Sequence, residues 1–132
     1  MTEIASNEFF DVKVDLQKNR IFNSNHNFWT SEVMDNYLIS MDKAMSMVQK
    51  NFTLVVDLRK LKTFSPELAE SSKQMMIKLN QAGLYKVAEI LPESAITKMQ
   101  LNKSTKTTNM PNQQFSEVSA GETWLDAEVQ KL

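Results

Sequence analysis

The chain has 132 residues, 42% of them hydrophobic and 23% charged, with 15 Lys and Arg against 16 Asp and Glu. This composition predicts a single globular domain, and the balanced charge gives no basic surplus that would favour nucleic acid or an anionic membrane. The absence of cysteine excludes disulfides, thiolate metal sites and a cysteine nucleophile. No run approaches the roughly 18 apolar residues of a membrane span. The first residues lack a signal-peptide pattern, so we expect a cytoplasmic protein with no integral membrane segment.

The N-terminal part predicts a leader, a β-hairpin and a helix. Residues 1–8 are mostly polar, so we expect a disordered leader, with one domain over 9–132. Apolar and polar residues alternate from Phe10 to Val14, and a weaker strand pattern returns over 21–28 after a polar turn. Thr30 or Ser31 can cap the helix that follows. Its apolar positions recur every three or four residues, at Met34, Leu38, Met41, Met45 and Val48.

The central stretch predicts a βαβ unit. Two short apolar runs, 52–58 and 85–91, are rich in β-branched residues. The segment between them begins with Ser65-Pro66-Glu67, which supplies an N-cap, a first-turn proline and an acid at the positive end of the helix dipole. Gly83 ends that helix. This order predicts two parallel, buried strands with a right-handed crossover.

The remaining chain predicts a third helix, an edge strand and a final helix. Ser94 follows Pro92 and can cap a helix that extends to Leu101, and 113–118 has the pattern of a short strand. Ser119 and Glu122 have the spacing of a capping box at the start of the last helix. The predicted fold class is therefore α/β (α+β mixed), ordered β-β-α-β-α-β-α-β-α, with a mixed five-stranded sheet packed on helices.

The chain has too few glycines and histidines for several common kinds of functional site. The chain has two glycines, too few for the glycine-rich turns that bind dinucleotides or phosphates. A single histidine, His26, provides neither a histidine pair for a metal nor a Ser-His-Asp triad, and we interpret it as a polar residue of the hairpin. We therefore expect no cofactor and no metal site. An enzyme would need Asp57 with Lys60 or Lys98 as an acid-base pair, and their spacing does not demand that role.

Asp57 lies near the carboxyl end of a buried strand, where α/β folds gather their sites. A phospho-acceptor aspartate of a receiver domain occupies such a place, but receivers also need a pair of acids after the first strand. The first strand here runs into a hairpin, so we favour a structural interpretation in which Asp57 binds loop N–H groups or Arg59.

Ser65 allows two compatible interpretations. It fits the N-cap of the central helix, and a phosphate there would gain the free N–H groups and the dipole of the helix start. We favour the N-cap. Nine methionines are also present, mostly at helical positions, and we favour core packing over an exposed apolar surface for those on the stripes.

The chain resembles a known family. The element order and Leu54-Val55-Val56-Asp57-Leu58 are similar to the STAS domains of anti-sigma-factor antagonists. Four further motifs are similar to small bacterial STAS-like (SpoIIAA-like) proteins. They are Phe28-Trp29-Thr30, Ala82-Gly83-Leu84-Tyr85-Lys86-Val87-Ala88, Met99-Gln100-Leu101 and, loosely, Glu122-Thr123-Trp124-Leu125.

This resemblance implies a non-enzymatic module that binds a partner protein, with a phosphorylated serine at the start of the second helix as the switch in antagonist members. The Asp-Ser-Ser-Gly segment of those members is replaced here by Phe64-Ser65-Pro66-Glu67, so the kinase-controlled switch does not carry over. Glu67 offers a permanent negative charge instead. The candidate partner-binding or switch residues are Thr63, Phe64, Ser65, Glu67 and Asp57.

Two alternatives stay open. The methionine and aromatic content also suits a carrier or sensor of a small apolar ligand or lipid, bound between sheet and helices. A homodimer is compatible with the same sequence, and neither the partner nor the pathway follows from these residues.

Overall fold

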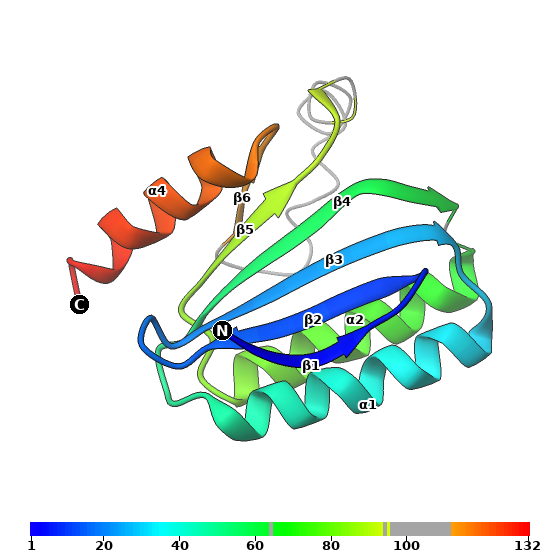
Figure 1. The fold of residues 1–132 in the computed structure, drawn as a ribbon, viewed down its shortest axis with the longest axis horizontal. Coiled ribbons are helices and arrows are strands. Elements are labelled where there is room, and N and C mark those ends of the chain that lie inside the picture. The colour runs from blue at the N-terminus through cyan, green and yellow to red at the C-terminus, as the bar shows by residue number, and fades with distance from the viewer. Residues whose placement is uncertain (64, 94, 96–111) are drawn as a thin grey trace.

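A single six-stranded sheet, with strands in the order β1 to β6, carries helices on both faces (Figure 1). This computed structural model describes residues 1–63, 65–93, 95 and 112–132. The elements are β1 Thr2–Ser6, β2 Phe10–Asp15, β3 Arg20–Phe28, α1 Ser31–Met47, β4 Thr53–Thr63, α2 Pro66–Gln81, β5 Lys86–Ile90, β6 Asn112–Phe115 and α4 Val118–Val129.

The sheet is mixed. Strands β1, β2 and β3 pair antiparallel, and β3 to β6 pair parallel. The predicted hairpin is β2–β3, and the predicted βαβ unit is β4–α2–β5. The mixed α/β fold class is therefore confirmed, with six strands in place of five.

The additional strand corrects the expected leader. Residues 2–6 form β1, which pairs with β2 from Thr2 opposite Val14 to Ser6 opposite Asp11. Ile4 and Ala5 are half-buried against the core. An edge strand needs one paired side only, so the partner strand β2 can order a polar segment that has little hydrophobic pattern of its own.

The core has one layer of side chains on each face of the sheet. Helices α1 and α2 lie side by side over one face, and α4 lies on the opposite face near β5 and β6 (Figure 1). Leu54 and Val56 of β4 pack towards α1 and α2, whereas Val55 packs with Ile90 and Leu125 towards α4. Both faces of the first half of β4 are covered, which explains why the sequence is almost unbroken apolar there.

The helix ends mostly follow the predicted signals. Thr30 caps α1 by accepting the N–H of Val33 at 3.3 Å, and Gly83 follows α2 with a positive φ of 104°. The predicted capping box of α4 is wrong, because the helix begins at Val118 after Glu117, which makes no side-chain cap hydrogen bond. The predicted third helix, 94–101, lies outside the described residues except for Ala95. No helix in the described part of the chain is long and apolar enough to cross a membrane.

Gly121 sets how closely α4 approaches the sheet. A Cβ at this position would lie 2.9 Å from Ile90 Cδ1 and 3.0 Å from Ala88 Cβ. Gly121→Ala is expected to lower the free energy of unfolding by about 1 kcal/mol, because this overpacking outweighs the better helix propensity of alanine. Urea denaturation measures the change. Ala120→Gly on the exposed side of α4 is the control for propensity alone, and a stabilised Gly121→Ala variant would contradict the close approach.

Candidate functional site

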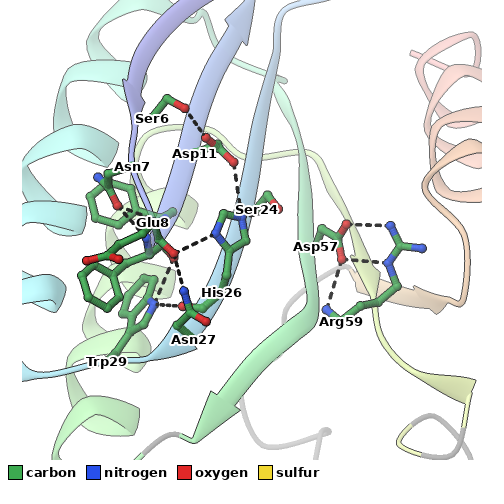
Figure 2. Close-up of polar contacts among 12 residues, drawn as sticks. Ser6, Asn7, Glu8, Asp11, Ser24, His26, Asn27, Trp29, Asp57 and Arg59 are labelled. Atoms are coloured by element: carbon green, nitrogen blue, oxygen red, sulfur yellow. Dashed lines mark hydrogen bonds and ion pairs between the residues drawn. The ribbon is translucent and has the colours of Figure 1, made fainter.

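Asp57 lies at a β-bulge on the α4 face of the sheet. Ser24 pairs with Asp57 and His26 with Lys60, so β4 uses one more residue than β3 over the same stretch. The Asp57 carboxylate accepts the backbone N–H of Arg59 at 3.1 Å and its guanidinium at 3.0 and 2.8 Å (Figure 2). Both carboxylate oxygens are thus occupied by Arg59, as the structural interpretation of Asp57 predicts.

The charge of Asp57 stabilises the bulge. Partial burial acts to raise the pKa of its carboxyl, but the hydrogen bonds and charge of Arg59 hold this pKa below the ordinary value of 3.8. The folded state therefore gains stability from ionised Asp57 above that ordinary value and loses it as the pH falls through the lower pKa of the folded state.

Asp57→Asn is expected to lower the free energy of unfolding by about 1 kcal/mol near neutral pH, because hydrogen bonds to an ionised group are lost. The difference from the wild type should shrink as the pH falls through the pKa of Asp57. Urea denaturation across the acid range measures both effects. Asp42→Asn, which loses an exposed pair with Lys78, is the matched control with almost no expected effect. If Asp57→Asn lowers the free energy of unfolding equally at every pH, the loss comes from packing and not from the charge of Asp57.

Ser65 and Glu67 lie at the start of α2. Ser65 Oγ accepts the N–H of Leu68 at 3.2 Å, and Pro66 occupies the first turn, so Ser65 is the N-cap that the sequence predicts. Both Ser65 and Glu67 are exposed. An exposed hydroxyl and an acid thus share the positive end of a helix dipole. Phosphorylation of Ser65 stays the compatible alternative to this role.

The structure brings only some of the predicted residues together. Thr63 ends β4 opposite Phe28, two residues before Ser65, while Phe64 lies outside the described residues. Asp57 is separate from this group, because it belongs to the face that α4 covers, whereas α2 packs on the other face. Arg59, the partner of Asp57, also forms an ion pair with Glu117 just before α4, at 3.9 Å through Nη1.

A second polar group surrounds His26 (Figure 2). His26 Nε2 lies 3.3 Å from Asp11 Oδ2 and 3.2 Å from Ser24 Oγ, and its Nδ1 lies 3.2 Å from the backbone oxygen of Glu8. Asn27 donates to the same Glu8 oxygen at 2.6 Å. These contacts join the β1–β2 turn to β3, as expected of a polar hairpin residue.

This group does not have the geometry of a catalytic triad. In a triad, the acid and the nucleophile contact opposite nitrogens of the imidazole ring. Here Asp11 and Ser24 both approach Nε2, and Nδ1 faces a backbone oxygen. The arrangement can hold the turn but cannot relay a proton from Ser24 to Asp11 through the ring.

A partly open cavity of about 150 Å³ lies between the sheet and helices α1 and α2. Its walls are mainly apolar, and the bulge contributes to them because it lets Leu58 and Leu61, three residues apart, both pack on this side of β4. Half-buried Ser72 and Met76 of α2 also line it. The sequence predicted a site of this kind only as an alternative, from its methionines and aromatic residues.

Two polar side chains of the sheet also face this cavity. Asn25 of β3 is buried beside Tyr37, whose hydroxyl accepts from Asn23 Nδ2. Burial raises the pKa of Tyr37, and hydrogen bonds with Asn23 and Asn25 partly offset that rise. Glu89 of β5 is buried as well, and its Oε1 accepts from Asn112 and, at 3.1 Å, from Gln114. Burial raises the pKa of Glu89 against the effect of these hydrogen bonds.

Sequence reasoning missed Asn25 and Glu89. The available signals were polar residues on the core-facing side of a strand, at Asn23 and Asn25 after Ile21, and a carboxylate inside the apolar run 85–91. Within the described residues, no group of three or more His, Asp or Glu could hold a metal ion.

The comparisons with known proteins concern the fold. No family model and no curated protein matches this sequence. The structure is similar to that of an uncharacterised protein of the DUF3478 family from Shewanella loihica PV-4, described as having a SpoIIAA-like fold. The two share 12% sequence identity with a TM-score of 0.70, and the match covers 92% of this chain and 97% of that chain. The predicted SpoIIAA-like fold is confirmed.

Proposed function

We propose that the chain is a cytoplasmic, non-enzymatic regulatory module that binds a partner protein through the surface where α2 begins. The observation that carries this proposal is the exposed pair Ser65 and Glu67 at the N-terminus of α2, in a chain with a SpoIIAA-like fold. The position corresponds to the serine-bearing helix start that the sequence resemblance implies. Glu67 gives it a fixed negative charge.

Photo-crosslinking in the native host tests this proposal. A photoreactive amino acid at Glu67 should give a discrete adduct with one protein, whereas the same amino acid at exposed Lys43 of α1 should not. Both positions are on helix surfaces, so the comparison separates a specific contact from nonspecific crosslinking. Identical adducts at the two positions, or none at Glu67, would contradict binding through this surface.

A second candidate function is a sensor or carrier of a small apolar ligand, and the observation that favours it is the mainly apolar cavity between the sheet and α1 and α2. Native mass spectrometry of protein purified without unfolding tests it. A bound species that is released on denaturation would support the candidate. A spectrum of the bare chain alone, together with no uptake of added ring compounds, would count against it.

A further inference from the structure

Asn25, a buried residue of the cavity wall, has one side-chain atom with no hydrogen-bond partner among the described residues. Asn25 is 6% exposed and lines the cavity from β3, and its Oδ1 accepts no hydrogen bond in that part of the chain. A buried acceptor without a donor is costly, because it has given up its hydrogen bonds with water. A ligand that donates a hydrogen bond to this oxygen would remove that cost.

The negative charge of Glu89 in the cavity wall disfavours anionic ligands. Glu89, 8% exposed, lies in the wall on β5, and the described lining residues include no Lys, Arg or His. A carboxylate or phosphate ligand would bring its charge close to Glu89, and no described lining residue supplies a cation to balance either group. The cavity therefore favours neutral ligands over fatty acids and lipid headgroups.

The volume of the cavity limits the size of the ligand. It measures about 150 Å³, and a cavity of about this size in another protein holds a single benzene ring. A long acyl chain does not fit within this volume. Starting from the ligand-binding candidate above, we infer that the cavity binds a neutral, ring-sized molecule whose hydroxyl or N–H group donates a hydrogen bond to Asn25 Oδ1.

Matched ring compounds test this inference on the full chain. p-Cresol and toluene differ only by the hydroxyl, and benzoate carries a charge. Isothermal titration calorimetry should show p-cresol binding roughly three- to tenfold more tightly than toluene, which is the range of one net hydrogen bond. Benzoate should show no binding.

Two variants test whether Asn25 Oδ1 causes the preference for p-cresol over toluene. Asn25→Leu replaces the amide with an apolar group of nearly equal size, so it should weaken p-cresol binding to the level of toluene and leave toluene unchanged. Asn36→Leu on the exposed side of α1 is the control and should preserve the preference. In the wild type, the side-chain amide resonances of Asn25 should shift more with p-cresol than with toluene, a readout that does not depend on the variant folding.

The outcomes separate this inference from the candidate function on which it rests. Equal binding of toluene and p-cresol would overturn the hydrogen-bond assignment and leave a ligand-binding cavity. Tightest binding of benzoate, or p-cresol binding that Asn25→Leu does not change, would also overturn the inference. Binding of none of the three compounds, with no bound species in native mass spectra, would overturn both.

Discussion

Arg20→Ala is expected to lower the free energy of unfolding by about 3 kcal/mol, because it removes a buried cation and the packing of its aliphatic stem. Arg20 is 1% exposed at the start of β3. Its guanidinium lies 2.8 Å from Asp126 and 3.4 Å from Glu122 of α4, and Nε donates to Thr53 of β4 at 2.9 Å. One side chain thus joins two strands to the C-terminal helix. Urea denaturation followed by circular dichroism measures the loss.

Lys18→Ala is the matched control for this prediction. Lys18 contacts the same two carboxylates at 3.5 and 4.0 Å, but its side chain is 45% exposed. An exposed pair contributes about 0–1 kcal/mol, so this variant should be almost as stable as the wild type. Arg20→Met, which keeps much of the apolar volume, should be less destabilised than Arg20→Ala. Equal losses for Arg20→Ala and Lys18→Ala would show that burial of the cation does not matter.

The regular part of the fold was predictable because its determinants are local. The alternation of apolar and polar residues from Phe10 to Val14 indicates a strand with one buried face. The apolar run of β4 indicates a strand with both faces buried. Ser65-Pro66 and Gly83 define the helix between β4 and β5 through a local cap hydrogen bond and local backbone geometry. In contrast, β1 depends on pairing with β2, a contact that no pattern within residues 2–6 specifies.

The candidate site was less predictable because its features arise from tertiary packing. The partner of Asp57 was predictable, since Arg59 is close in sequence. The cavity was not, because its volume depends on how α1 and α2 pack over a bulged β4, and no residue type specifies an unfilled space. Asn25 and Glu89 break the apolar pattern, but only the structure shows that they face the same cavity.

Helix α2 connects the two candidate functions. Its exposed first turn presents Ser65 and Glu67, and its buried side lines the cavity through Ser72, Met75 and Met76. A ligand in the cavity would contact the same helix that the proposed partner recognises. The two functions are therefore compatible in one molecule, and partner crosslinking at Glu67 with and without p-cresol would measure any coupling between them.

Glu89→Gln is expected to raise the free energy of unfolding by about 2 kcal/mol near pH 8, because it removes a charge that is costly to bury. The glutamine oxygen can still accept the hydrogen bonds from Asn112 and Gln114. Because burial raises the pKa of Glu89 above the ordinary value of 4.5, the folded state keeps this proton to a higher pH than the unfolded chain does. The wild type therefore loses stability as the pH rises through this window, and the variant lacks that loss.

The pH dependence distinguishes this mechanism from a simple gain in packing. Urea denaturation of Glu89→Gln and the wild type should show a large difference at about pH 8 and a smaller one at about pH 5, where the folded wild type holds more of its proton. Glu70→Gln on the exposed side of α2 is the control and should change stability little at either pH. A destabilised Glu89→Gln variant would mean that the ionised carboxylate makes an interaction that the fold requires. That result would also weaken the argument for a neutral ligand, because the argument assumes that the negative charge of Glu89 is unfavourable in this cavity.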